Sequence, residues 1–216
     1  MSNKTNKYFD IYPPVFYPSS IIIVLFIILT LVIGKPMEQV FSNLQSGITT
    51  NAGWLLVLVV NIFLALALYF SISKIGRIRL GGKDAEPEFS TFGWFSMLFS
   101  AGLGIGLLFY GVGEPMMHFS NSVINEAPGT AEAAKTAMKY TFLHYGLHAW
   151  AIYAVLGVAL AFFAFNKGLP LTLRSVFYPL LGDKINGRIG DVIDIIAVVA
   201  TLFGLATSLG LGVGQI

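Results

Sequence analysis

The sequence has 216 residues, of which 56% are hydrophobic and 11% are charged. Because soluble domains carry roughly 25% charged residues, this composition excludes a soluble protein and predicts an all-α integral membrane protein. The formal net charge of +2 gives no indication of a nucleic-acid partner. The absence of cysteine excludes disulfides, thiolate catalysis and cysteine metal ligands within these residues.

A hydrocarbon core about 30 Å thick is crossed by roughly 20 apolar residues in a helix. Five stretches are predicted to be transmembrane helices, and in chain order they cover residues 18–33, 53–73, 92–113, 140–165 and 192–216. No cleavage site of small residues follows the first apolar stretch, so we interpret it as a retained span. A segment containing TAEAAKTAMK is predicted to form a short surface helix between the third and fourth spans.

The third stretch contains five glycines within twelve residues, Gly102, Gly104, Gly106, Gly111 and Gly113. Glycine costs roughly 1 kcal/mol relative to alanine inside a helix, so a regular helix is disfavoured here. Non-helical backbone at membrane depth is tolerated only beside protein or a water-filled cavity. The stretch therefore predicts a broken transmembrane helix, ended by Glu114 and Pro115, whose backbone lines a solute and ion site. Close helix packing through the Gly-x-x-x-Gly spacing is the alternative.

The fourth stretch carries three aromatic residues within an arc of about 140° on one helix face. Core packing or an interfacial belt explains such a face. The alternative is half of an aromatic cage, which binds a quaternary ammonium group by cation–π attraction worth roughly 2 kcal/mol or more when desolvated. His144 and His148 have the spacing of a metal pair, but no third ligand lies nearby in the sequence, so no metal site is expected. The three aromatic residues are Tyr145, Trp150 and Tyr153.

Polar residues of the fifth stretch have ordinary explanations. Asp191 and Asp194 are interpreted as residues that cap the helix start and interact with its dipole. Thr201 lies near the predicted midplane, where a hydrogen bond to a carbonyl of its own helix is the default. A contribution of Thr201 to an ion or substrate cavity is the alternative.

Ten basic residues fall on one side of the predicted membrane and three on the other. The positive-inside rule therefore places the N-terminus and both basic loops in the cytoplasm of a multi-pass protein. The loops are residues 74–90 and 166–191, and the three opposite residues are Lys35, Lys135 and Lys139.

Three motifs, AGLGIGLLFYGVGEP, HYGLHAWAIY and LPLTLRSVFYPLLG, together resemble the betaine/carnitine/choline transporter family over nearly the whole chain. The resemblance implies a twelve-span fold of two peripheral helices and two inverted five-helix repeats, as in the sodium-coupled leucine transporter. Residues 1–17 would then be a cytoplasmic tail, 18–73 the peripheral helices, and 92–216 the first three helices of the first repeat. Such a fragment is expected to be inactive by itself.

The resemblance also implies a binding site. Ser100 and Leu103 would supply backbone oxygens to sodium, and Thr201 would match a second sodium site. In that site Leu205 replaces a hydroxyl residue, which weakens the assignment. Gly106 stands where proton-coupled choline carriers tend to have aspartate, which favours sodium coupling. Substrate contacts would come from Gly102, Gly104, Gly106, Tyr145, Trp150 and Tyr153.

We therefore expect a secondary transporter for sodium-coupled uptake of a compatible solute such as glycine betaine, in the plasma membrane and, by resemblance, as a homotrimer. Sodium is the expected coupling ion, and neither a cofactor nor an enzymatic activity is expected. Two alternatives remain open. One is proton-coupled or exchange transport of choline or carnitine, and the other is a non-transporting scaffold in which the glycines serve helix packing alone.

Overall fold

The computed structural model describes residues 11–102, 104–121, 124 and 126–214, and the secondary structure of this part of the chain is helical without a strand. Within these described residues, four helical segments are long and apolar enough to cross a membrane, which agrees with an all-α membrane protein. These segments are Pro13–Ile33, Pro36–Ile72, Ala131–Asn166 and Arg188–Val213.

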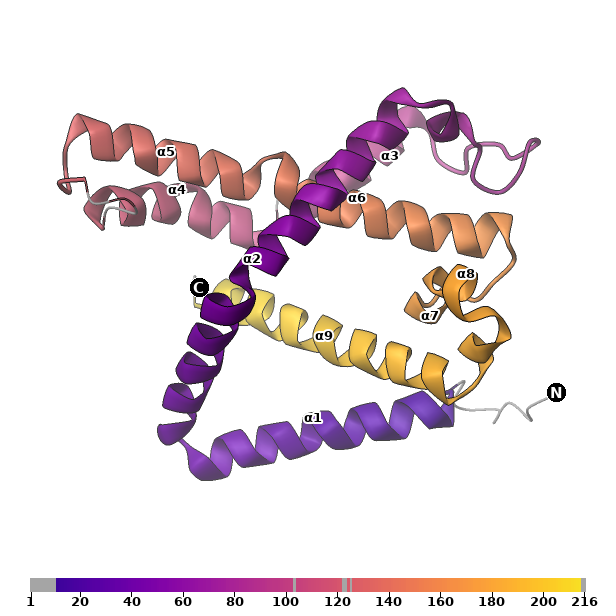
Figure 1. The fold of residues 1–216 in the computed structure, drawn as a ribbon, viewed down its shortest axis with the longest axis horizontal. Coiled ribbons are helices and arrows are strands. Elements are labelled where there is room, and N and C mark those ends of the chain that lie inside the picture. Colours follow the sequence, from indigo (N-terminus) through magenta and orange to yellow (C-terminus); the bar gives the residue numbers. More distant parts are fainter. Residues whose placement is uncertain (1–10, 103, 122–123, 125, 215–216) are drawn as a thin grey trace.

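The first two helices are joined by a short turn (Figure 1). Helix α1, Pro13–Ile33, starts with proline and ends before Gly34, which has φ 66°. Both residues suit these positions, because proline presets the first helical turn and glycine adopts positive φ without strain. Helix α2, Pro36–Ile72, has 37 residues and therefore starts much earlier than the predicted 53. Helix α2 ends in the short 3₁₀ segment η1, Lys74–Arg77.

The glycine-rich stretch forms two helices instead of one. Helix α3, Thr91–Gly102, has 12 residues, and helix α4, Ile105–Ser120, has 16. Between them Gly104 is extended, with φ −56° and ψ 159°. The predicted interruption near residue 104 is therefore observed. Because each half is shorter than the roughly 20 residues that cross a bilayer, neither counts alone as a span.

The predicted end of this stretch at Glu114 and Pro115 is wrong. Helix α4 continues through Pro115 to Ser120 and therefore contains His118. Although proline removes one backbone hydrogen bond, α4 packs along α5, Ala131–Tyr145, over its length (Figure 1). This tertiary contact explains why the helix persists past a residue that usually interrupts one.

Helices α5 and α6, Leu147–Ala161, bend at Gly146 and continue into the π-helical turn Phe162–Asn166. The bend requires glycine, because a Cβ atom at Gly146 would lie 2.4 Å from the carbonyl oxygen of Phe142. The predicted surface helix is therefore the first part of α5, and its N-terminus is capped by Thr130, whose hydroxyl accepts from the Ala133 N–H at 3.2 Å.

The last segment folds back beneath α6 and then forms α9. It contains two single-turn helices, α7, Leu173–Val176, and α8, Tyr178–Leu181, followed by the 3₁₀ segment η3, Gly182–Asn186, and α9, Arg188–Val213. Ile185 is fully buried. Gly190 packs so closely on it that a Cβ atom would lie 1.8 Å from the Ile185 carbonyl oxygen. Helix α9 also packs on α1, where the Phe26 and Phe203 rings meet edge to face at 4.6 Å.

Candidate functional site

The indole of Trp150 lies directly against the end of α3. A Cβ atom placed on Gly102 would be 3.4 Å from Cη2 of Trp150, so the glycine leaves room for the ring. The Trp150 Nε1–H donates to the carbonyl oxygen of Tyr145 at 3.1 Å, and the rings of Trp150 and Tyr153 are 5.8 Å apart. Two predicted cage residues are thus brought together beside the break between α3 and α4.

Tyr145 takes a different place in this arrangement. Its ring lies 4.6 Å from that of His144, while its backbone carbonyl orients Trp150. Trp150 and Tyr153 have exposed fractions of 45% and 70%, so their rings present free surface beside the break. Such a pair has the chemistry of an open half-cage for a cation without hydrogen-bond donors.

Of the predicted sodium ligands in the described part of the chain, Ser100 lies at a helix end and Thr201 lies in the middle of α9. Ser100 belongs to the last turn of α3, where carbonyl groups lack partners within the helix. Gly104 directly precedes α4 and Gly106 is its second residue, while Leu103 lies outside the described residues. Carbonyl oxygens exposed in this way are suitable ligands for a small hard cation.

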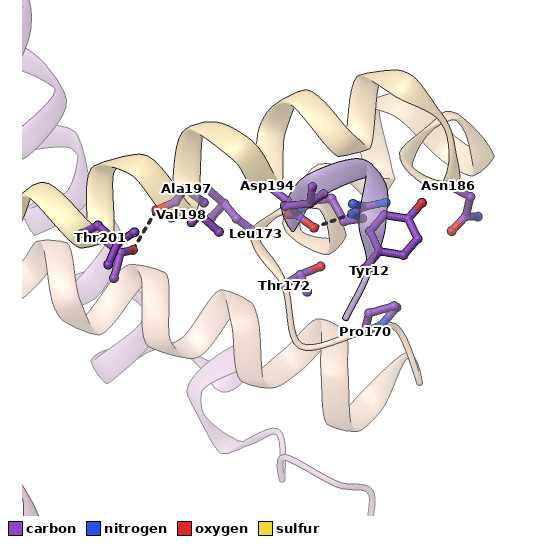
Figure 2. Close-up of a pocket in the computed structure, with 12 residues that line it drawn as sticks. Tyr12, Pro170, Thr172, Leu173, Asn186, Asp194, Ala197, Val198 and Thr201 are labelled. Carbon is purple, nitrogen blue, oxygen red and sulfur yellow. Dashed lines mark hydrogen bonds and ion pairs between the residues drawn. The ribbon is translucent and has the colours of Figure 1, made fainter. Parts of the chain in front are cut away.

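Thr201 donates to the carbonyl oxygen of Ala197 at 2.7 Å, which confirms the default interpretation. Thr201 also lines a cavity of about 810 Å³ that extends to Tyr12 near the start of α1 (Figure 2). Thr172 lies on the same cavity, and its buried hydroxyl oxygen has no hydrogen-bond partner.

Arg174, which the sequence did not single out, is buried beside this cavity with an exposed fraction of 8%. Its Nε donates to Asp194 Oδ2 at 2.5 Å and its Nη2 to Asp191 Oδ1 at 3.0 Å. A third bond joins its Nη1 to the carbonyl oxygen of Ile185 at 3.2 Å, and its guanidinium lies 5.2 Å from the ring centre of Tyr12. The network therefore ties α1, α7, η3 and α9 together at one end of the molecule.

The interpretation of Asp191 and Asp194 as capping residues is therefore wrong, although Asp191 does lie in the first turn of α9, where a carboxylate interacts favourably with the helix dipole. No side chain caps the start of α9, and both carboxylates bind Arg174 instead. Burial alone would lower the pKa of the Arg174 guanidinium, but its hydrogen bond to Asp194 and the charge of that carboxylate raise the pKa above its ordinary value. In the sequence, the one indication of this interaction was Arg174 itself, a basic residue within the otherwise apolar segment LPLTLRSVFYPLLG.

Glu114 forms a second polar cluster, between α4 and α5, in which its own side chain is 7% exposed whereas that of His144 is 61% exposed. Oε2 of Glu114 lies 2.7 Å from Nδ1 of His144. Its Oε1 lies 3.3 Å from Nε2 of His118, one turn further along α4. His144 therefore has a carboxylate partner from another helix, which the spacing to His148 could not reveal. Within the described part of the chain, no group of three or more acidic, histidine or cysteine side chains is arranged to hold a metal.

Comparison with known proteins identifies a family that matches this sequence. The model of the betaine/carnitine/choline family of transporters matches residues 14–216. A probable glycine betaine transporter of Desulfitobacterium hafniense is 50% identical over 202 residues, which are 94% of this chain and 40% of the relative.

Two further relatives have similar names. Glycine betaine transporter 1 of Vibrio parahaemolyticus is 46% identical over 211 residues, covering 96% of this chain and 40% of the relative. The glycine betaine transporter OpuD of Bacillus subtilis is 49% identical over 180 residues, or 83% of this chain and 35% of the relative. The chain thus spans 35–40% of the length of these relatives.

Proposed function

This chain belongs to the betaine/carnitine/choline transporter family, whose members are transporters and not enzymes, and we propose a function from that membership. The chain is the N-terminal part of a multi-pass transporter for quaternary ammonium solutes. The substrate class follows from the names of its relatives, which are glycine betaine transporters at 46–50% identity. Glycine betaine is the proposed substrate.

The observation that carries this proposal is the contact between the broken helix and the aromatic pair. Trp150 packs on Gly102 at the end of α3 and lies 5.8 Å from the ring of Tyr153. A trimethylammonium group cannot donate a hydrogen bond, so ring faces recognise it better than polar groups do. An interrupted helix beside such rings leaves space for the solute and exposes backbone dipoles, and binding sites at the midplane of secondary transporters are built from these two features.

Coupling to sodium is the second part of the proposal. Sodium would bind carbonyl oxygens at the end of α3, at Ser100 and Leu103, and Thr201 would belong to a second site. An ion that binds one conformation more tightly shifts the protein toward that conformation, and affinity for the solute rises with it. Gly106 supports sodium over proton coupling, because it places no titratable group at this position.

The resemblance to this family extends the proposal in four respects. We propose a complete fold of two inverted repeats, a third span formed by α3 and α4 together, a homotrimer, and a location in the plasma membrane. The N-terminus and both basic loops are proposed to face the cytoplasm. Residues 1–216 alone are proposed to be inactive.

The deciding experiment is uptake of radiolabelled glycine betaine by the full-length protein in cells that lack other betaine carriers. We expect uptake in sodium medium and its loss when potassium replaces sodium. Uptake that follows a proton gradient and ignores sodium would favour the choline or carnitine alternative. A well-expressed protein without uptake of betaine, choline or carnitine would favour a scaffold.

A further inference from the structure

The two halves of the broken helix are both held by the helical run that contains α5 and α6. On the α3 side, Trp150 packs on Gly102. On the α4 side, Glu114 contacts His144 of α5 at 2.7 Å. The two contacts are linked, because the residue after His144 is Tyr145, whose carbonyl oxygen accepts the Trp150 indole N–H. A continuous chain of contacts thus runs from α4 through α5 and α6 to α3 and bridges the break.

The contact with His144 offsets the cost of burying the Glu114 carboxylate. Its side chain is 7% exposed, and a buried carboxylate is costly unless hydrogen bonds compensate for lost water. The next residue, Pro115, has no N–H to donate within α4, so the helix lacks one of its own hydrogen bonds at this point. The side-chain contact to α5 therefore stabilises α4 where its backbone is weakest.

We propose that Glu114 is a positioning residue for the substrate site, which it serves through His144 and His118 by fixing α4 against α5. The proposal rests on the transport function above, because it is that site whose geometry would be fixed. Glu114 need not touch substrate. It sets the separation between the start of α4 and the Trp150–Tyr153 pair.

Spin labels at two exposed positions, Val112→Cys on α4 and Met138→Cys on α5, report the α4–α5 separation without relying on transport. The full-length protein is used, with any cysteines beyond residue 216 replaced. We expect a narrow distance distribution in the parent protein. Glu114→Gln keeps the size of the side chain and removes its charge, so it should broaden the distribution.

His144→Gln should have the same effect as Glu114→Gln, and the double variant should be no worse than either, because the residues act as one unit. His148→Gln is the matched control, since His148 lies on the same helical run outside the cluster, and it should behave like the parent protein. A distribution in Glu114→Gln that is as narrow as that of the parent protein would overturn the proposal.

Uptake kinetics complete the test. We expect Glu114→Gln to raise the KM for glycine betaine severalfold with maximal rate less affected, and His148→Gln to leave KM unchanged. A broadened distance distribution with an unaltered KM would overturn the positioning role. A distribution that is narrow in the parent and broadened by Glu114→Gln, in a protein that takes up no quaternary ammonium solute, would overturn the proposed function and, with it, the role of Glu114 at that site, while the helix contact itself would stand.

Discussion

Trp150 shows how one side chain connects backbone geometry to recognition. Its position is set by a glycine that leaves space for the indole, by a carbonyl that binds its N–H, and by a neighbouring tyrosine ring. The sequence predicted that Trp150 and Tyr153 share a helix face. It could not predict the contact with Gly102, because the relative placement of α3 and α6 depends on packing between distant segments.

Replacing Trp150 by alanine should raise the KM for betaine by about 25-fold, since one desolvated cation–π contact is worth about 2 kcal/mol and 1.4 kcal/mol is tenfold. Trp150→Phe retains a ring and should cause a smaller increase. Both variants are compared by tracer uptake at equal surface expression. An unchanged KM in the alanine variant would exclude Trp150 from the cage.

Arg174 is the second residue whose environment permits a quantitative expectation. Arg174→Ala should lower the free energy of unfolding by about 3–5 kcal/mol, because Asp194 would remain buried without its cation. Arg188→Ala, at an exposed position near the start of α9, is the control and should change it by less than about 0.5 kcal/mol. Thermal and denaturant unfolding in detergent would measure both. Equal stability of the two variants would show that the buried network contributes little.

At the scale of elements, the sequence predicted helix type well and helix ends poorly. Apolar runs of sufficient length identified α1, α6 and α9, and clustered glycines identified the break between α3 and α4. The early start of α2 and the continuation of α4 past Pro115 were missed. The continuation of α4 reflects its packing on α5, which overrides a weak local preference. Residues 36–52 at the start of α2 are largely exposed and polar, so a criterion of apolar length did not include them.

Gly104→Ala tests whether the break matters. A Cβ atom there would meet only the Ala101 carbonyl oxygen, at 3.8 Å, so the methyl group fits. The substitution should favour continuous helix by about 1 kcal/mol and reduce betaine uptake about fivefold. Gly111→Ala, inside α4 and in open space, should leave uptake unchanged. Faster amide exchange near residue 104 in the parent than in Gly104→Ala would show, without a transport assay, that the substitution stabilises continuous helix.

For the whole molecule, the decisive question is whether α3 and α4 together cross the membrane. With five spans, the loops that contain Lys83 and Lys184 lie on the same side, whereas with four they lie on opposite sides. The excess of basic residues on those loops favours five.

Single cysteines at Lys83→Cys, Lys135→Cys and Lys184→Cys, in the full-length protein without other cysteines, would be labelled in intact cells with a membrane-impermeant maleimide. We expect labelling at position 135 alone, and labelling of all three after permeabilisation. Labelling at both 135 and 184, or at 184 alone, would contradict the five-span arrangement.

The length of α2 has a practical consequence. At 1.5 Å per residue its 37 residues measure about 55 Å, almost twice the thickness of the hydrocarbon layer. Tilts of membrane helices rarely exceed about 40°, so the polar N-terminal turns of α2 must extend beyond the hydrocarbon layer. An antibody fragment or a fused marker attached to these turns would give electron microscopists a mark for the orientation of α2.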